Sequence, residues 1–351
     1  METSWAERRR IRFFCFSAYV FQNADKTDFN KKIVCIFTAV KRLFPDMSNL
    51  LYHFVAFIVV AIWGSTFVFT KLLLNGGLSP AQIFTLRFII AYVLLLATSL
   101  SYYPRKMGWT KTGLKKFRLF ADSVKDEMLM LGLGISGGSL YFLTENSAMN
   151  YTTTTNTSLI VCLCPLFATA LISLFYKSER LSKIQILGTL MAALGVVVVV
   201  LNGHFVLHLS PLGDALAFAA CLCWAVYSLL MIPASQKYNT IFVTRKVFFY
   251  GLVSMLPYYW FVPGFPSLAD IMRPEVLNNL LFLGCVASML CFLVWNWVIK
   301  KLGAVAATNY VYFNPVTTIV FAWMVLSEDI TVYFIIGSVL IIAGMFLSNK
   351  K

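Results

Sequence analysis

Apolar residues dominate the chain from about residue 52 to residue 348, and short polar interruptions divide this region into segments of similar length. A helix of roughly 20 residues crosses the ~30 Å hydrocarbon core of a bilayer. We therefore predict an all-α integral membrane protein with ten transmembrane helices. They span residues 52–74, 80–103, 127–147, 152–176, 181–202, 211–232, 241–263, 276–299, 304–326 and 331–348. Most loops are too short to form a separate domain, so we expect any functional site inside the helix bundle.

A set of identical residues occurs twice in the chain, in the same order and about 150 residues apart. The first set is Asn146, Pro165, Ser178-Glu179, Gly188 and Gly195, and the second is Asn296, Pro315, Ser327-Glu328, Gly337 and Gly344. A duplicated apolar unit is typical of transporters built from structural repeats. A unit with five crossings must reverse its orientation in the second copy. We therefore predict two inverted five-helix repeats, at residues 47–205 and 206–351.

Residues 1–46 differ from the rest of the chain. They begin with a basic cluster, Arg8-Arg9-Arg10, and a short apolar run, but no A-x-A-like cleavage site follows, as a signal peptide would require. Three interpretations stay open: a cytoplasmic extension, a membrane-surface segment, or upstream sequence from a misassigned start. The third is favoured because Met47 leads directly into the first predicted helix. A chain beginning at Met47 is expected to transport normally.

The charges are distributed unevenly across the predicted membrane. The chain is 59% hydrophobic and 13% charged, with a net charge of +14. Alternate loops place 26 of the 29 Lys and Arg residues on one side and only Arg273 on the other. This pattern follows the positive-inside rule and predicts a multi-pass protein of a bacterial-type inner membrane with both termini in the cytoplasm. It also argues against nucleic acid as the partner of the basic residues.

The order of motifs in the first half of the chain matches a known pattern. The motifs are Trp63-Gly64-Ser65-Thr66-Phe67, Lys71, Ser79-Pro80, Arg87-Phe88, Ala91, Pro165-Leu166-Phe167, Ser178-Glu179-Arg180-Leu181, Gly188 and Gly195. Together with the duplication, they make residues 50–348 resemble the EamA family of the drug/metabolite transporter superfamily. The resemblance implies ten helices in two inverted repeats around a central cavity, with alternating access for small metabolites. The second copy departs at its start, where Trp224-Ala225-Val226-Tyr227 stands in place of Trp63-Gly64-Ser65-Thr66.

Polar and aromatic residues recur at helical spacing within the apolar segments. Trp63, Thr66 and Thr70 share one face of the first predicted helix, since residues three and seven apart lie on the same side. Such stripes line a cavity or hold helices together. We predict that the substrate contacts Trp63, Thr66, Thr70, Tyr141, Thr155, Ser158, Trp224, Tyr227, Asn296, Thr308 and Tyr312. An aromatic, lightly polar cavity suits amino acids, nucleobases or other amphiphilic metabolites.

Three ionisable residues are the most informative, Lys71, Arg87 and Glu145, which lie toward the outer ends of the first three predicted helices. A charge at the centre of a bilayer costs at least ~2.5–3.5 kcal/mol. Either the basic side chains reach the headgroups, or all three form a gate or coupling cluster that also grips a carboxylate or phosphate. Burial would favour the neutral form of Glu145 unless a cation pairs with it, so we consider this carboxyl a candidate proton carrier. Pro165 and Pro315 bend their helices and are candidate hinges.

Other functions have weaker support in the sequence. Gly134-Ile135-Ser136-Gly137-Gly138 matches the pattern around a nucleophilic serine, but no histidine falls in the middle of a predicted helix to serve as base. A lipid-moving protein or a sensor on the same scaffold is a further alternative. No Walker motif is present, so we expect a secondary transporter without cofactor or metal. We favour export over import and leave proton coupling and a homodimer open.

Overall fold

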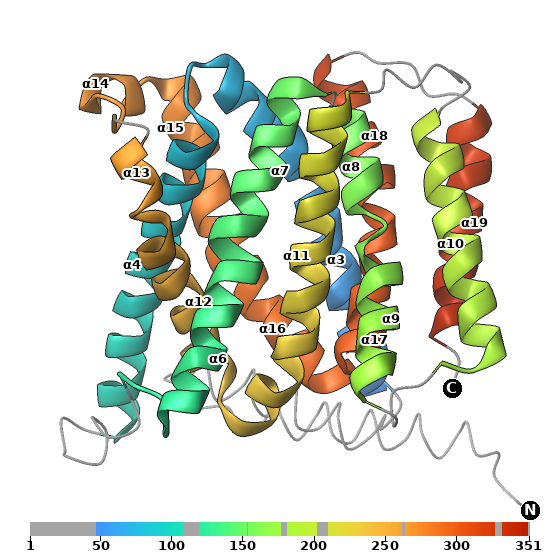
Figure 1. The fold of residues 1–351 in the computed structure, drawn as a ribbon, viewed down its shortest axis with the longest axis horizontal. Coiled ribbons are helices and arrows are strands. Elements are labelled where there is room, and N and C mark those ends of the chain that lie inside the picture. Colours follow the sequence, from blue (N-terminus) through green and yellow to red (C-terminus); the bar gives the residue numbers. More distant parts are fainter. Residues whose placement is uncertain are drawn as a thin grey trace, which may run out of the picture. The chain divides into compact units, whose positions relative to one another are not determined.

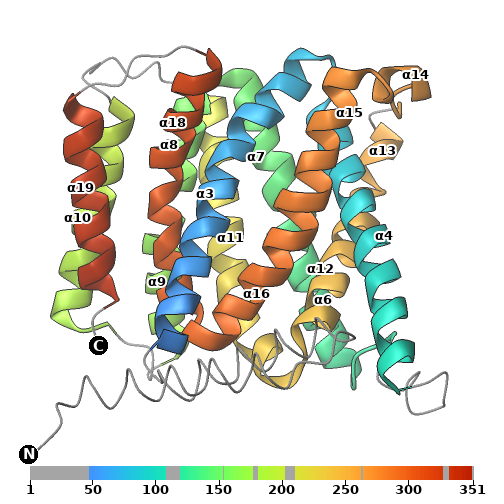
Figure 2. The same ribbon diagram turned by 180° about the vertical axis from the view of Figure 1, so that it is seen from behind.

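Helices make up nearly all of the described part of the chain in the computed structural model (Figures 1 and 2). The structure describes residues 47–107, 119–152, 154–176, 181–201, 210–261, 264–326 and 332–349. The chain divides into two units, residues 1–51 and 52–351. The described part of the first unit is the beginning of helix α3, and the second unit is the helix bundle considered below.

The helices follow one another as the apolar segments predict. The first half contains α3 (Met47–Asn75), α4 (Pro80–Met107), α6 (Val124–Gly134), η1 (Ile135–Ser139), α7 (Leu140–Tyr151), α8 (Thr154–Val161), α9 (Cys164–Phe175) and α10 (Lys183–Leu201). The second half contains α11 (Pro211–Lys237), α12 (Thr240–Met255), α13 (Tyr258–Phe261), α14 (Leu268–Ile271), α15 (Pro274–Leu281), η3 (Phe282–Leu290), α16 (Cys291–Leu302), α17 (Ala304–Thr308), η4 (Asn309–Phe313), α18 (Asn314–Leu326) and α19 (Val332–Ser348). No strand occurs in these described segments.

Each of the ten predicted segments contains helix, but not every helix is long and apolar enough on its own to cross a bilayer. Five in the described chain are: Leu50–Asn75, Pro80–Leu100, Thr157–Phe175, Pro211–Lys237 and Pro274–Leu302. Two further apolar helices, Lys183–Val199 and Val332–Ser348, are shorter. The chain is therefore a multi-pass membrane protein by the length and composition of its helices.

Several predicted helices are interrupted at corresponding places. The third contains the π-helical turn η1 and the eighth contains the π-helical segment η3. The fourth breaks between α8 and α9, and the ninth passes through the 3-10 segment η4 before α18. Pro165 and Pro315 are each the second residue of the helix that follows the break, where a proline costs no backbone hydrogen bond. π-Helical segments occur frequently at functional sites.

Helices α10 and α19 lie side by side in both views (Figures 1 and 2). Their glycines meet in pairs: a methyl group built on Gly344 would lie 2.7 Å from the carbonyl oxygen of Gly188. One built on Gly195 would lie 2.8 Å from the carbonyl oxygen of Gly337. Since the residue numbers rise along one helix as they fall along the other, the two helices are antiparallel. The absence of side chains at these four positions lets the backbones touch.

Candidate functional site

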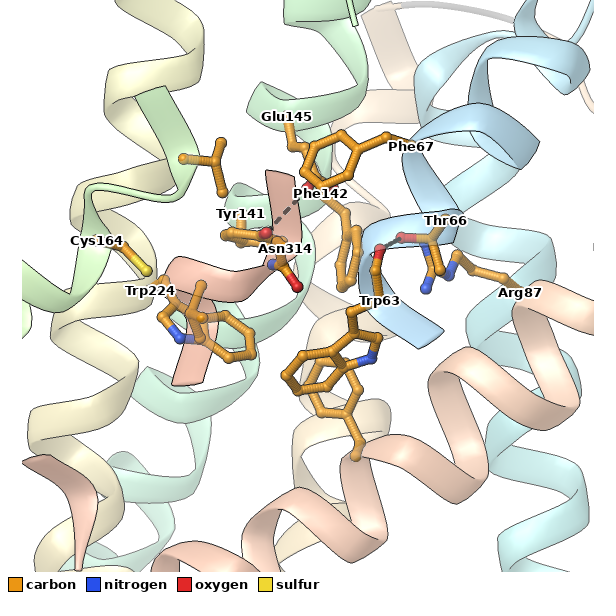
Figure 3. A pocket seen from close by; sticks show the side chains of 13 residues that line it. Trp63, Thr66, Phe67, Arg87, Tyr141, Phe142, Glu145, Cys164, Trp224 and Asn314 are labelled. Carbon is orange, nitrogen blue, oxygen red and sulfur yellow. Dashed lines mark hydrogen bonds between the residues drawn. The ribbon is translucent and has the colours of Figure 1, made fainter. Parts of the chain in front are cut away.

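A small cavity lies where helices from both halves of the second unit converge (Figure 3). Its walls come from α3, α4, α7, α8, α9, α11, α16, η4 and α18. The lining residues are Trp63, Thr66, Phe67, Arg87, Tyr141, Phe142, Glu145, Val161, Cys164, Trp224, Phe292, Val311 and Asn314. The free volume is about 30 Å³, room for little more than a water molecule, whereas small-molecule sites usually measure ~300–1,000 Å³. Any metabolite can therefore enter only after the helices move apart.

Aromatic rings form one wall of the cavity. Trp63 and Trp224 meet edge to face, and the ring centroid of Phe292 lies 5.5 Å from Trp63 and 6.1 Å from Trp224. Tyr141 extends the group, with its ring centroid 5.2 Å from Trp224. The Trp63 indole donates to the carbonyl of Ala287 at 2.9 Å, which fixes its orientation against η3. These flat faces can hold an apolar or aromatic group of a ligand.

Arg87 supplies the positive charge of the cavity. The residue is 2% exposed, its Nε donates to Ser288 Oγ at 2.8 Å, and its guanidinium carbon lies 4.4 Å from the centre of the Phe142 ring. Across the described residues, no hydrogen bond or ion pair reaches its two terminal nitrogens. A guanidinium has five N–H donors, so most of its hydrogen-bonding capacity is unused.

Glu145, on α7, supplies the negative charge of the cavity. The hydroxyl of Tyr141, one turn earlier, donates to Glu145 Oε1 at 2.9 Å. Its other oxygen has no partner within the described chain, and the residue is 7% exposed. Arg87 and Glu145 line the same cavity, yet no ion pair within 4 Å joins these two described residues. Opposite charges therefore face one small space while each is held by a different neutral partner.

Two further polar groups of the lining are buried without a hydrogen-bond partner in the described chain. They are the indole Nε1 of Trp224 and the amide Oδ1 of Asn314. A buried polar group that is left unpaired costs ~1–3 kcal/mol, so both groups are available to a ligand. Asn314 was not among the residues that sequence reasoning selected. Its position directly before Pro315, at the start of α18, was the available indication.

The predicted contact residues separate into two groups. Trp63, Thr66, Tyr141 and Trp224 line the cavity, together with Arg87 and Glu145. The others, whose side chains the structure describes as buried or nearly so, lie outside the lining: Thr70, Ser158, Tyr227, Asn296, Thr308 and Tyr312. The side chain of Thr155 lies outside the described residues.

Tyr227 and Asn296 form a polar network of their own. The Tyr227 hydroxyl donates to Asn296 Oδ1 at 2.5 Å, and Asn296 Nδ2 donates to Thr244 Oγ1 at 2.9 Å. This chain connects α11, α16 and α12 within the second half. Thr308 lies 3.4 Å from Ser228, hydroxyl to hydroxyl, and belongs to the same side of the bundle. These contacts join helices, and the residues reach the cavity only through their neighbours.

Lys71 lies apart from the charged pair in the cavity. Its ammonium donates to the carbonyl of Met149 at 2.7 Å, in the last turn of α7, which ends at Tyr151. A cation at a helix C-terminus interacts favourably with the helix dipole. The predicted three-residue cluster is thus reduced to Arg87 and Glu145 as the residues that face one another.

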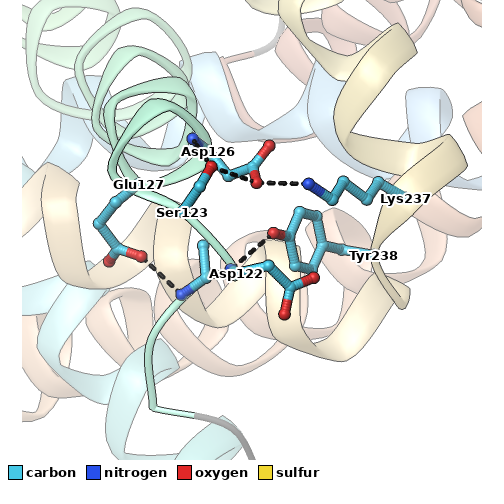
Figure 4. Close-up of polar contacts among 7 residues, drawn as sticks. Asp122, Ser123, Asp126, Glu127, Lys237 and Tyr238 are labelled. Atoms are coloured by element: carbon cyan, nitrogen blue, oxygen red, sulfur yellow. Dashed lines mark hydrogen bonds and ion pairs between the residues drawn. The ribbon is translucent and has the colours of Figure 1, made fainter.

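Polar contacts join the beginning of α6 to the end of α11 (Figure 4) and also to α12. Lys237 Nζ lies 2.5 Å from Asp126 Oδ2, and the Tyr238 hydroxyl accepts from the backbone N–H of Asp122 at 2.9 Å. Glu127 accepts from Lys246 and from Tyr250, both on α12. We call these residues, Asp122, Asp126, Glu127, Lys237, Tyr238, Lys246 and Tyr250, the polar clamp. It connects helices of the two halves at one end of the bundle.

Features that would favour an enzyme or a metal protein are weak in the described chain. The Ser136 hydroxyl donates to the Gly132 carbonyl at 2.7 Å within its own helix. Gly134 packs closely, since a methyl group there would lie 2.5 Å from Tyr250 Cβ. Within the described residues no group of three or more His, Cys, Asp or Glu side chains could hold a metal ion. Cys164 is a free, buried thiol that lines the cavity.

The model of the EamA-like transporter family matches residues 50–201 and again residues 211–350. The chain belongs to this family. It is therefore a membrane transporter, and the cavity shared by both matched regions is its candidate site for a small-molecule substrate. The observation agrees with the resemblance seen in the motifs.

Related proteins can be aligned with most of this chain. An uncharacterized transporter of Archaeoglobus fulgidus is 29% identical over 303 residues, which cover 85% of this chain and 97% of the relative. A probable amino-acid metabolite efflux pump of Salmonella typhimurium is 26% identical over 306 residues, 84% of this chain and 93% of the pump. One solved crystal structure aligns with a TM-score of 0.62 at 19% identity, covering 85% of this chain and 96% of that chain. The last likeness concerns the fold alone.

Proposed function

We propose that the protein is a secondary active transporter that exports amino acids or similar amphiphilic metabolites by alternating access. The observation that supports this proposal most directly is the cavity. It is buried where both halves meet, and it combines aromatic faces with one positive group, Arg87, and one negative group, Glu145. Such a lining suits a small solute with an apolar body and polar ends. The similarity to a probable amino-acid metabolite efflux pump supports the same substrate class and direction.

The proposed architecture is ten transmembrane helices in two inverted repeats, residues 47–205 and 206–351. Three observations support it. The family model matches once within each repeat. Gly188 and Gly195 of α10 contact Gly344 and Gly337 of α19, each meeting the partner of the other in the repeat, in an antiparallel arrangement. The chain runs through α8 and α9 in the direction opposite to its course through α17 and α18 (Figures 1 and 2). Labels placed after Tyr176 and after Met324 should therefore be accessible from opposite faces of the membrane.

The proposed location is a bacterial-type inner membrane with both termini in the cytoplasm. The excess of Lys and Arg on one side of the predicted membrane supports this orientation. It places the polar clamp at the cytoplasmic end of the bundle. The clamp and the narrow cavity then correspond to a state closed toward the cytoplasm, and export requires the clamp to open. Pro165 and Pro315, at the breaks before α9 and α18, remain the proposed hinges.

Glu145 is the proposed site of proton coupling, since it is buried, faces the cavity and keeps one oxygen unpaired. Replacement of Glu145 by Gln should abolish transport driven by a pH gradient, while some exchange of substrate across the membrane persists. Pairing of two copies as a homodimer remains a prediction from the sequence.

A two-step experiment tests the proposed function. Metabolites released by cells with and without the protein are compared, and flux of the leading candidate is measured in liposomes that contain the purified protein. We expect protein-dependent release of an amphiphilic metabolite, strongly reduced by Trp63→Ala. Absence of any solute difference, in cells and in liposomes, would overturn the proposal.

A further inference from the structure

We infer that Arg87 and Glu145 form a two-point charge filter, so that the transported solute is a zwitterion with an anionic group at Arg87 and a cationic group at Glu145. This inference rests on the proposed function and assigns the charge class of its substrate. It does not depend on the direction of transport or on the ion that drives it.

The first support is that the two charges are held apart. At low dielectric, opposite charges attract strongly, and a pair that only neutralised itself would close to contact. Arg87 instead bonds Ser288 and packs on Phe142, while Glu145 accepts from Tyr141. These neutral partners hold each charge in its own place in the lining and leave no ion pair within 4 Å between the two described residues.

The second support is the unused bonding capacity that each group directs to the same space. The two terminal nitrogens of Arg87 and the second oxygen of Glu145 lack partners in the described chain. A guanidinium matches a carboxylate through two parallel hydrogen bonds, and a carboxylate accepts from an ammonium group. A solute with both groups satisfies both residues at once, whereas a solute with one charge leaves the other residue buried and unpaired.

The third support is that the remaining lining is neutral. Arg87 and Glu145 are the only residues with formal charges among the lining residues, which otherwise are aromatic, aliphatic or weakly polar. The body of the solute is therefore apolar or lightly polar. Trp224 Nε1 and Asn314 Oδ1, both unpartnered in the described chain, provide one further donor and one further acceptor.

Matched solutes test the charge filter. Leucine, 3-methylbutylamine and 4-methylpentanoate share a branched body and carry both charges, only the positive charge or only the negative charge. Phenylalanine, 2-phenylethylamine and 3-phenylpropanoate form the same series with an aromatic body. Binding to the purified protein is followed by quenching of tryptophan fluorescence and by thermal stabilisation. The wild type should bind at least one zwitterion about tenfold or more tightly than either of its singly charged analogues.

Each variant should relax selectivity for one charge. The Arg87→Gln variant should bind the zwitterion no more tightly than its amine analogue, because both solutes then keep only the contact to Glu145. The Glu145→Gln variant should bind the zwitterion no more tightly than its carboxylate analogue. Arg87→Lys should retain part of the selectivity, and Arg273→Gln, at an exposed arginine of the loop before α15, should retain all of it. If a glutamine variant fails to fold, the wild-type preference still decides the matter.

The outcomes separate this inference from the proposed function. Equal or tighter binding of the singly charged analogues in both series would overturn the charge filter, even if transport of another solute were established. A change in pH dependence alone in Glu145→Gln, with selectivity unaltered, would also overturn it and would make Glu145 only a proton carrier. Zwitterion binding without flux in liposomes would instead contradict the proposed transport and leave the filter standing.

Discussion

The indole rings of Trp63 and Trp224 meet edge to face, with their centroids 5.3 Å apart and their planes at 89°. The two tryptophans come from α3 and α11, the first helices of the two proposed repeats. Both rings line the cavity, and an aromatic or apolar group of the proposed substrate would lie against them. Edge-to-face pairs contribute about 0.5–1.5 kcal/mol beyond the burial of their area, so the contact can be opened by a bound ligand.

Removal of either ring is expected to impair transport. Trp63→Ala and Trp224→Ala should each lower the flux of the substrate roughly tenfold or more in liposomes, because each deletes one wall of the cavity. Trp260→Ala is the matched control, since Trp260 is 86% exposed and is not a lining residue. Flux of the two cavity variants equal to that of the control would argue against this cavity as the transport route.

Weakening of the polar clamp is expected to expose the cavity at the end of the bundle where α6 begins. Cys164 is a suitable reporter, since it lines the cavity and is 1% exposed, and the other cysteines can be replaced by serine. Lys237→Glu sets a like charge against Asp126. It should increase the rate at which a membrane-impermeant maleimide labels Cys164 from that side several-fold.

Charge exchange provides the control for the clamp. The double variant Asp126→Lys, Lys237→Glu restores opposite charges and should return labelling to the original rate. Arg273→Glu disturbs another surface ion pair, with Asp270, and should have no effect from the clamp side. If Lys237→Glu, the double variant and Arg273→Glu all leave the labelling rate of Cys164 unchanged, the clamp does not control access to the cavity.

The clamp should remain intact throughout the physiological pH range. The hydrogen bond from Lys237 is the main cause that lowers the pKa of Asp126 below its ordinary value of 3.8, and Ser123 adds to it. A lowered pKa gives stability that is fully present above the ordinary value and is lost as pH falls through the folded value. The thermal stability difference between wild type and Asp126→Asn should therefore be constant from about pH 5 to pH 8 and vanish in stronger acid. A difference that disappears near neutral pH would contradict this assignment.

The glycine contacts of α10 and α19 should tolerate no added methyl group. In Gly344→Ala the new carbon would lie against backbone atoms of Ala192 and Gly188, which cannot rotate away. Overpacking of this kind costs about 1–3 kcal/mol, so the unfolding temperature in detergent should fall by several degrees. Gly132→Ala is the control, because its nearest neighbour is the end of the Leu230 side chain at 3.1 Å. Equal stability of the two variants would show that α10 and α19 separate easily.

The sequence predicted most of the helices and part of the cavity lining. Physical reasons explain which features it predicted and which it missed. Hydropathy located the long apolar helices, because apolar length is what a bilayer selects, but it did not predict the short helix α14 and could not reveal the breaks at η1, η3 and η4. Helical spacing found Trp63, Tyr141 and Trp224, which combine an aromatic ring with a polar group. It missed Phe142, Phe292 and Val311, since an apolar residue facing a cavity has the same pattern as one facing a neighbouring helix. Spacing within one helix also could not separate Arg87 from Lys71, because contacts between helices decide which basic residue lines the cavity together with Glu145.

The paired glycines of α10 and α19 have a consequence for how the halves exchange roles. Gly188 touches Gly344 and Gly195 touches Gly337, so the contact looks the same when the two helices are interchanged. In the proposed alternating-access cycle each half adopts in turn the shape of the other, and such a self-complementary crossing then has no preferred side. We therefore expect the surrounding helices to tilt about this crossing, while the four glycines keep the same neighbours at the beginning and at the end of the cycle.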